Sequence, residues 1–251
     1  MIKFFRKIRQ KMLTENKFSK YLIYAIGEII LVVIGILIAL SINTSKEEFL
    51  EKKSTINIFE QIQRDLTNDS LQLRESINSI SLTNKTIVDI LENKIHDSIY
   101  NNIDSISYSF DQIKKIRALV TSFDKISPNN KGYNLLKSSN QTRLVDDQLA
   151  NDIISYYSTM MTTLPELNQA VVEVSKRNIQ EYKQYDWFEN WAQNKYDHRF
   201  IEYMRDSPDN RKRMGEYYIY SSVNEKYWKS IEQNRKLLKS KIKKRIKLSR
   251  N

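Results

Sequence analysis

The chain contains few groupings of side chains that could carry out chemistry. A histidine stands beside an aspartate twice, as His96–Asp97 and as Asp197–His198. A general base positioned by a carboxylate uses this pair of residue types, but only where the fold brings further groups and a substrate to it. Two exposed histidines, in loops or at helix ends, are the simpler interpretation. We therefore predict no catalytic residue from either pair.

Two further groupings have both a functional and a structural interpretation. Asp146 and Asp147 stand together ahead of a helical pattern, where a carboxylate can cap a helix or join a metal site. We favour the cap and assign it to Asp146. The stretch YDWFENW (185–191) concentrates aromatic rings that can stack on a ligand or a nucleic-acid base. Three of these rings have the spacing of one helix face, which favours packing in a core.

The whole chain contains no cysteine and two histidines. These counts exclude disulfides, thiol catalysis and cysteine-based zinc sites, and they argue against a histidine-built metal site. We find no phosphate-binding glycine loop, nucleophile elbow or dinucleotide fingerprint. The prediction is therefore no catalytic, cofactor-binding or metal site, and no cofactor. An enzyme with its site between helices stays an alternative that no motif supports.

One carboxylate, Glu28, has an unusual setting, because it is the single charge in the apolar run 21–42. About 20 apolar residues cross the ~30 Å hydrocarbon core of a bilayer, so we predict a transmembrane helix over 21–42. A cleaved signal peptide is the alternative, since Ala39-Leu40-Ser41 has small residues at the spacing of a cleavage site. The run is longer than the roughly 7–15 apolar residues of a signal peptide, which favours an uncleaved anchor.

The distribution of positive charge predicts the orientation of this helix. The leader, residues 1–20, holds seven basic residues and one acidic residue, whereas residues 43–53 hold three lysines and three glutamates. Basic residues accumulate on the cytoplasmic side of a membrane helix. We therefore expect a cytoplasmic leader over 1–20 and an extracytoplasmic helical domain over 43–251.

Glu28 itself has two interpretations. Its side chain can extend to the head groups or be protonated within the bilayer. Alternatively, Glu28, Gly35 and Ala39 form one stripe of the helix, with Gly27 beside it, and small residues four apart allow a second helix to approach closely. The second interpretation predicts a membrane-helix contact, either with a second copy or with another membrane protein.

The rest of the chain predicts long helices, because it has only 4 glycines and 3 prolines. We expect the anchor helix to continue to about residue 95, although Asp69 and Asn84 interrupt its apolar seam. A connection over 96–109 and a second helix over 111–125 follow, then a turn at 127–132 and a short helix. The predicted fold class is all-α: an N-terminal transmembrane helix followed by an antiparallel, mostly four-helix bundle.

The last two long helices have clear patterns. One begins after Asp146, contains Pro165, which should kink it, and runs to about residue 191. The other covers 210–248 after a turn at 205–210. Heptad-like runs also suit an intermolecular coiled coil, but the turns favour a chain that folds back on itself.

The C-terminal tail, 235–251, is strongly basic: residues 233–251 hold nine basic residues and no acidic one. A solvated helix end explains such a tail, since cations suit a helix C-terminus. Alternatively the tail contacts anionic lipid, with its apolar residues in the membrane interface. The expected lipid contacts are Lys236, Lys239, Lys241, Lys243, Lys244, Arg245 and Lys247, and the apolar residues are Leu237, Leu238, Ile242, Ile246 and Leu248.

Two stretches carry a family resemblance. MIKFFRKIRQKMLTENKFSKYLIYAIGEIILVVIGILIALSIN and, later, YNLLKSSNQTRLVDDQLANDIISYY resemble a bacterial family of uncharacterised, small, membrane-anchored proteins. The resemblance implies a single-span, mostly helical protein of Gram-negative cells, and with the orientation above we expect it in the inner membrane with its helical domain in the periplasm. It implies no activity and no catalytic residue.

These observations predict a non-enzymatic membrane protein whose periplasmic helical domain binds a protein partner or ligand, as an envelope accessory or sensor-like component. A membrane-tethered enzyme is the alternative. A third reading, a nucleic-acid binder that uses the basic tail, requires a cytoplasmic C-terminus, against the charge asymmetry, so no nucleic acid is expected as a partner.

Overall fold

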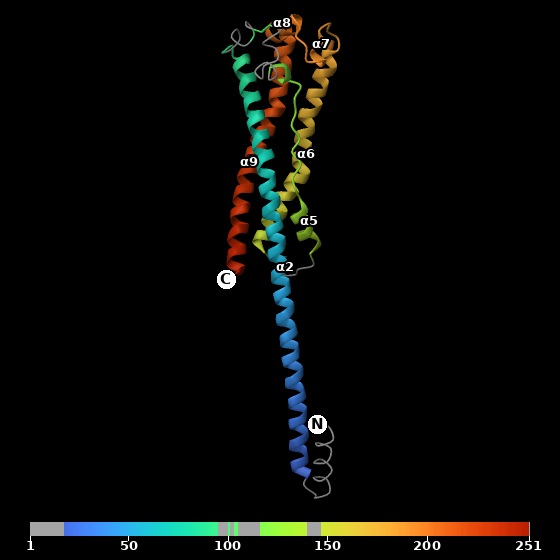
Figure 1. Cartoon of the computed structure of the whole chain (residues 1–251), viewed down its shortest axis with the longest axis vertical. Helices are drawn as coiled ribbons and strands as arrows, with labels where there is room; N and C mark the ends of the chain where they lie inside the picture. The colour runs from blue at the N-terminus through green and yellow to red at the C-terminus, as the bar shows by residue number, and fades with distance from the viewer. Residues whose placement is uncertain (1–17, 95–99, 101–102, 105–115, 140–146, 251) are drawn as a thin grey trace. The chain divides into compact units, whose positions relative to one another are not determined.

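The computed structural model (Figure 1) describes residues 18–94, 100, 103–104, 116–139 and 147–250. Within these ranges every regular element is a helix. The helices are α2 (Phe18–Leu91), α5 (Lys131–Ser138), α6 (Gln148–Tyr182), α7 (Phe188–Ala192), α8 (His198–Asp206) and α9 (Pro208–Arg250). The prediction of an all-helical protein with one long apolar helix near the N-terminus is confirmed.

The chain forms two compact units, Met1–Ile56 and Asn57–Asn251, and the boundary between them lies inside α2. In the first unit the described side chains from 22 to 42 are exposed on all faces of the helix, apart from the half-buried Ala25. Fifteen of them are large and apolar. Of the described helices, α2 is the one long and apolar enough to cross a membrane. A helix that is apolar all round matches a lipid environment, because its main-chain polar groups are bonded within the helix.

The second unit contains the core, which lies between the later part of α2 and the two long helices α6 and α9 (Figure 1). Each helix contributes apolar residues at steps of three, four or seven, which place them on one face. Fully buried members of the three stripes are Ile62, Leu66 and Leu73 of α2, Ile153, Tyr157 and Leu164 of α6, and Met214, Trp228 and Ile242 of α9.

α9 runs antiparallel to α2. Arg211, near the start of α9, donates a 2.8 Å hydrogen bond to the carbonyl oxygen of Leu91 at the end of α2. Further along α9, Arg235 donates a 2.8 Å bond to the carbonyl oxygen of Leu66, which is earlier in α2. Near the end of α9, Lys241 and Arg245 form salt bridges with residues at the beginning of α6, Asp152 and Asp147. α9 is therefore antiparallel to α6 as well as to α2.

The predicted second long helix, 111–125, is wrong over most of its described part. Residues 116–118 form one helical turn, 119–121 a turn, and 122–130 have no regular secondary structure, while 111–115 lie outside the described residues. We call residues 119–130 the strap. The described chain therefore contains three long helices and the strap where four long helices were predicted. An extended chain rises ~3.3 Å per residue against 1.5 Å in a helix, so few residues suffice to return along the unit.

Side chains from α6 and α9 bond the main chain of the strap. Asn178 Nδ2 donates to the carbonyl oxygen of Val120 at 2.8 Å. The carbonyl oxygen of Ser122 accepts from Ser175 Oγ at 3.2 Å and from the Tyr217 hydroxyl at 2.8 Å. A buried main-chain segment outside a helix or sheet needs such partners, because an unpaired buried carbonyl is costly. Three polar residues in the helical stripes thus make the strap possible.

The third predicted helix corresponds to α6, with both of its ends displaced. Its N-cap is Asp147, whose Oδ1 accepts from the amide of Leu149 at 2.8 Å, whereas Asp146 lies outside the described residues. The helix contains Pro165, as predicted, but it ends at Tyr182 instead of continuing to Trp191. The last helix is confirmed, because α9 covers Pro208–Arg250. The short helix after the turn at 127–132 is confirmed as α5.

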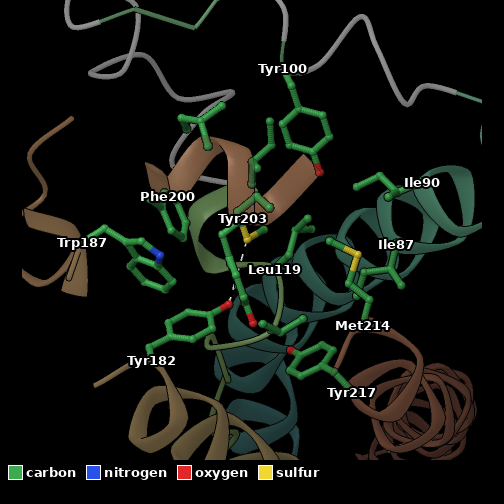
Figure 2. Packing of buried hydrophobic residues seen from close by; sticks show 14 of the residues in the cluster. Ile87, Ile90, Tyr100, Leu119, Tyr182, Trp187, Phe200, Tyr203, Met214 and Tyr217 are labelled. Carbon is green, nitrogen blue, oxygen red and sulfur yellow. Dashed lines mark hydrogen bonds between the residues drawn. The ribbon is translucent and has the colours of Figure 1, made fainter. Parts of the chain in front are cut away.

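α6 ends in a cluster of aromatic rings (Figure 2). Tyr182 is fully buried, and its ring packs edge-on against Trp187 with a centroid distance of 5.0 Å. Trp187 also contacts Phe200 of α8 at 5.0 Å. The interpretation of the stretch 185–191 as core-packing residues is therefore confirmed.

Candidate functional site

The predicted membrane-helix contact lies on the first part of α2. Gly27, Glu28, Gly35 and Ala39 are all exposed. A Cβ atom added at Gly27 or Gly35 would meet nothing within 4 Å. The two glycines thus have room for close approach by another helix, and no described part of the chain fills it.

A groove of about 210 Å³ lies between α6 and α9 in the second unit. Tyr156 and three aliphatic residues of α9 line it together with hydroxyl, amide and charged side chains. Lys241 Nζ lies 2.6 Å from Asp152 Oδ2 in its wall. Hydrogen bonds from Lys241 and Gln148 lower the pKa of Asp152. The sequence gives no sign of this groove, because its walls are the edges of two apolar stripes and not a motif. The lining residues are Asp152, Ser155, Tyr156, Thr159, Ile231, Asn234, Leu237, Leu238 and Lys241.

A pair of buried carboxylates is the feature most like an active site. Asp65 and Asp69 lie on successive turns of α2 and are each 3% exposed. Asp65 Oδ2 accepts from the amide of Gly132 at 2.6 Å, and its Oδ1 accepts from Gln61 at 2.8 Å. Asp69 Oδ1 accepts from the amide of Asn129 at 3.0 Å. Asp69 therefore binds the end of the strap, and Asp65 binds the beginning of α5.

The Asp65 contact caps α5 from another helix. The residue before α5, Asn130, makes no side-chain cap bond, and the amide of Gly132 in the first turn is satisfied by Asp65 instead. Helix N-termini leave such amides free, and a carboxylate suits the positive end of the helix dipole. The approach also depends on glycine, because a Cβ at position 132 would lie 2.5 Å from the main-chain nitrogen of Ile62.

Asp69 is the more perturbed of the two carboxylates. Burial raises its pKa, bonds from Asn129 lower it, Asp65 raises it and Arg235 lowers it. Its second oxygen, Oδ2, has no hydrogen-bond partner in the described part of the chain. Buried carboxylates with shifted pKa values are found at active sites, but also in structural networks. Neither Asp65 nor Asp69 lines the groove between α6 and α9, and the bonds that they accept hold the strap and α5 against α2.

A second polar group joins α2 to α9. Asn84 Nδ2 donates to Glu225 Oε2 at 2.6 Å, and Ser81 Oγ donates to Oε1 at 2.7 Å. Ser221 Oγ donates to Asn84 Oδ1 at 2.5 Å. Buried polar groups that satisfy one another fix the register of packed helices. The interruptions of the apolar seam by Asp69 and Asn84 are therefore positions where α2 bonds its neighbours.

The histidines do not form a catalytic pair in the described residues. His96, Asp97 and Asp146 lie outside them. His198 is exposed at the first position of α8. Its neighbour Asp197 caps α8, and the bonds from the Arg199 guanidinium hold the pKa of Asp197 well below its usual range. Among the described residues, no group of three or more acidic or histidine side chains is placed to hold a metal ion.

The basic tail is mostly part of α9. Some of its cations form ion pairs with described acidic residues, and others do not. Lys241 pairs with Asp152 and Arg245 with Asp147, both at the beginning of α6. Lys236 lies 3.4 Å from Glu232. The remaining predicted lipid contacts, Lys239, Lys243, Lys244 and Lys247, have no ion pair with any described residue.

The apolar residues of the tail also differ in exposure. Leu238, Ile242 and Ile246 are buried in the helical unit, so the expectation that they lie in a membrane interface is wrong. They continue the stripe that packs against the other helices. Leu237 and Leu248 are exposed by 57% and 64%.

Comparison of the chain with protein-family models, with curated proteins and with solved structures found no match.

Proposed function

We propose that this protein is a single-span protein of the bacterial inner membrane, with a periplasmic helical unit that binds a partner instead of catalysing a reaction. The exposed apolar run of α2 is the observation that carries the proposal. Its fifteen large apolar side chains have no cover from the described chain. Burial of apolar surface contributes roughly 25 cal/mol per Å², so a bilayer offers these residues a large stabilisation. Monomeric soluble proteins rarely expose an apolar patch of this size.

The charge distribution supports the orientation. The leader ahead of the apolar run has seven basic residues, and the segment after it is balanced. This asymmetry favours a cytoplasmic N-terminus and a periplasmic second unit.

The open stripe on α2 supports contact within the membrane. The two glycines have free space around them, and Ala39 lies four residues after Gly35 on the same side of the helix. Close helix approach at small residues and hydrogen bonds from a polar residue such as Glu28 drive association in lipid. We propose that this stripe pairs with a second copy or with another membrane protein.

The uses of the buried polar groups favour binding over catalysis. Asp65 and Asp69 bind main-chain amides of the strap and α5, and Asp197 caps α8. Each of these three acidic groups thus has a structural task. The membrane-tethered enzyme gains no support from these contacts.

Alkaline carbonate extraction of cell membranes tests the proposal. The full-length protein is expected in the pellet, and its intact mass is expected to include residues 1–42. A variant lacking 22–42 is the control and should appear in the supernatant. Recovery of the full-length protein in the supernatant would contradict the anchor, and a mass that begins at Ile42, directly after Ser41, would show a cleaved signal peptide.

A further inference from the structure

Two buried polar atoms of α9 have no hydrogen-bond partner in the described part of the chain. They are Oδ1 of Asn224 and Nε1 of Trp228. The two residues lie one helical turn apart and are only 2% and 1% exposed. Unpaired polar atoms are rare in protein interiors, because each one costs free energy when it leaves water. Each of these two atoms therefore indicates a partner that the described side chains do not supply.

Asn224 and Trp228 line the same small cavity, which has a volume of about 30 Å³. Thr83 of α2, Ser122 of the strap and Val171 of α6 also line it. The cavity therefore lies where α2, the strap, α6 and α9 meet. A bound molecule in this place would contact all of these elements at once.

The size of the cavity limits what it can hold. A buried water needs roughly 10–15 Å³ of accessible space and two or more polar partners. The cavity therefore has room for about one or two water molecules and is too small for an organic metabolite.

The two unpaired atoms define the chemistry of the bound molecule. The indole nitrogen of Trp228 only donates a hydrogen bond, which disfavours a cation beside it. Nδ2 of Asn224 donates to Oδ1 of Asn168 at 3.4 Å, so Oδ1 of Asn224 is the acceptor that is left over, which disfavours an anion. A water molecule both accepts and donates, so it satisfies both atoms.

We propose that this cavity is a binding site for internal water, which accepts a hydrogen bond from Nε1 of Trp228 and donates one to Oδ1 of Asn224. Thr83 in the wall offers a hydroxyl as a third partner, and buried waters make about three such bonds. The water joins α9 to α2 beneath the strap. The proposal concerns the helical unit alone and does not depend on the membrane anchor.

Nuclear magnetic resonance of the full-length, ¹⁵N-labelled protein in detergent micelles tests the site directly. The chain has three tryptophans, and the variants Trp187→Phe, Trp191→Phe and Trp228→Phe assign the indole signals. We expect cross-relaxation between the indole proton of Trp228 and water, with the sign of a long-lived bound water. Trp191 is the matched control and should lack this signal, because its indole donates to the carbonyl oxygen of Arg117 at 3.4 Å. A Trp228 indole without the water signal would overturn the proposal.

Hydroxyl protons that exchange with water can imitate such a signal, and one variant separates the two sources. Asn224→Leu keeps every hydroxyl of the wall, removes the acceptor and fills the cavity with an apolar side chain. We expect the water signal of Trp228 to disappear in this variant. A signal that persists at full strength would come from hydroxyl protons and would overturn the water site.

A cation is the other small occupant, because Asp124 also lines the cavity. Spectra of the wild-type protein in sodium chloride and in potassium chloride distinguish it from water. A water site predicts the same Trp228 indole resonance in both salts. A shift of the Trp228 resonance, with the Trp191 resonance unchanged, would overturn the proposal in favour of a bound cation.

Discussion

The amide of Gly132 donates a 2.6 Å hydrogen bond to Oδ2 of Asp65, 67 residues earlier in the chain. The bond caps α5 and holds it against α2, and it requires that no Cβ stand between Gly132 and the main chain of α2. It shows how a chain with three long helices closes its core: an extended strap and a short helix fill the fourth position and are bound by buried carboxylates.

Substitution of Gly132 by alanine should destabilise the helical unit. The new Cβ would lie 2.5 Å from the nitrogen and 2.6 Å from Cγ1 of Ile62, so α5 must shift and its bond to Asp65 lengthens. We expect a loss of about 1–3 kcal/mol in the free energy of unfolding. Urea unfolding of the detergent-solubilised protein, followed by tryptophan fluorescence, measures it, since all three tryptophans lie in this unit.

Gly215 provides the matched control. It lies inside α9, and an added Cβ would meet nothing within 4 Å. Alanine favours a helix interior over glycine, so Gly215→Ala should stabilise by about 0.5–1 kcal/mol. Equal effects of the two substitutions would show that the close approach at Gly132 is unimportant.

Protonation of Asp69 should raise the free energy of unfolding as the pH falls from neutral. Its pKa is raised above 3.8 by burial, so the folded chain binds a proton at a pH where the unfolded chain has lost it. The contribution of Asp69 to the free energy of unfolding therefore rises as the pH falls toward the raised pKa and decreases as the pH rises through it.

Asp69→Asn should remove this dependence. Asparagine keeps an oxygen that can accept from Asn129 and carries no charge to desolvate. We expect the variant to be more stable than wild type at about pH 7, with a smaller difference at about pH 5, in the same urea unfolding measurement. A variant less stable than wild type at both pH values would mean that the charge of Asp69 stabilises the fold.

The strap should loosen when its side-chain donors are removed. Asn178→Ala leaves the carbonyl oxygen of Val120 without its 2.8 Å bond, at a cost of about 1–3 kcal/mol. Tyr217→Phe should cost less, because Ser175 still donates to Ser122. Hydrogen exchange of peptides covering 119–130 should accelerate in both variants. Gln180→Ala, an exposed change on the same helix, should leave that exchange unchanged.

The stripe on the membrane helix should determine association in lipid. Gly35→Leu fills the space for a second helix, and we expect it to weaken self-association about tenfold, measured by energy transfer between labelled copies in liposomes. Glu28→Leu should weaken it and Glu28→Gln less so, because glutamine keeps hydrogen-bonding groups. Val33→Leu, on the opposite side of the helix, is the control. If Gly35→Leu and Val33→Leu give the same energy transfer, the stripe is not an interface between copies.

The long helices follow from local properties of the sequence. The scarcity of glycine and proline and the apolar steps through Ile62, Leu66 and Leu73 predict α2 almost to its end at Leu91. The turn at 205–210 likewise predicts the beginning of α9 at Pro208. These features depend on neighbours within a few residues, which a sequence pattern reports well.

The strap and the groove depend on distant residues, so the sequence did not predict them. Ile116, Leu119 and Val120 have helical spacing and are all buried, yet the chain leaves the helix after one turn. The donors that make this possible, such as Asn178, are more than fifty residues away. The one available signal was the pair Asp65 and Asp69 within an apolar stripe, since buried carboxylates require partners.

Accessibility of single introduced cysteines tests the membrane anchor most directly, because the chain has none of its own. A membrane-impermeant maleimide is added to spheroplasts that express full-length variants with cysteine at Lys11, Val33, Ser54 or Lys226. The account predicts labelling from outside at 54 and 226, labelling at 11 only after permeabilisation, and none at 33 in the intact membrane. Labelling at 33 as fast as at 54, or labelling at 11 from outside, would contradict it.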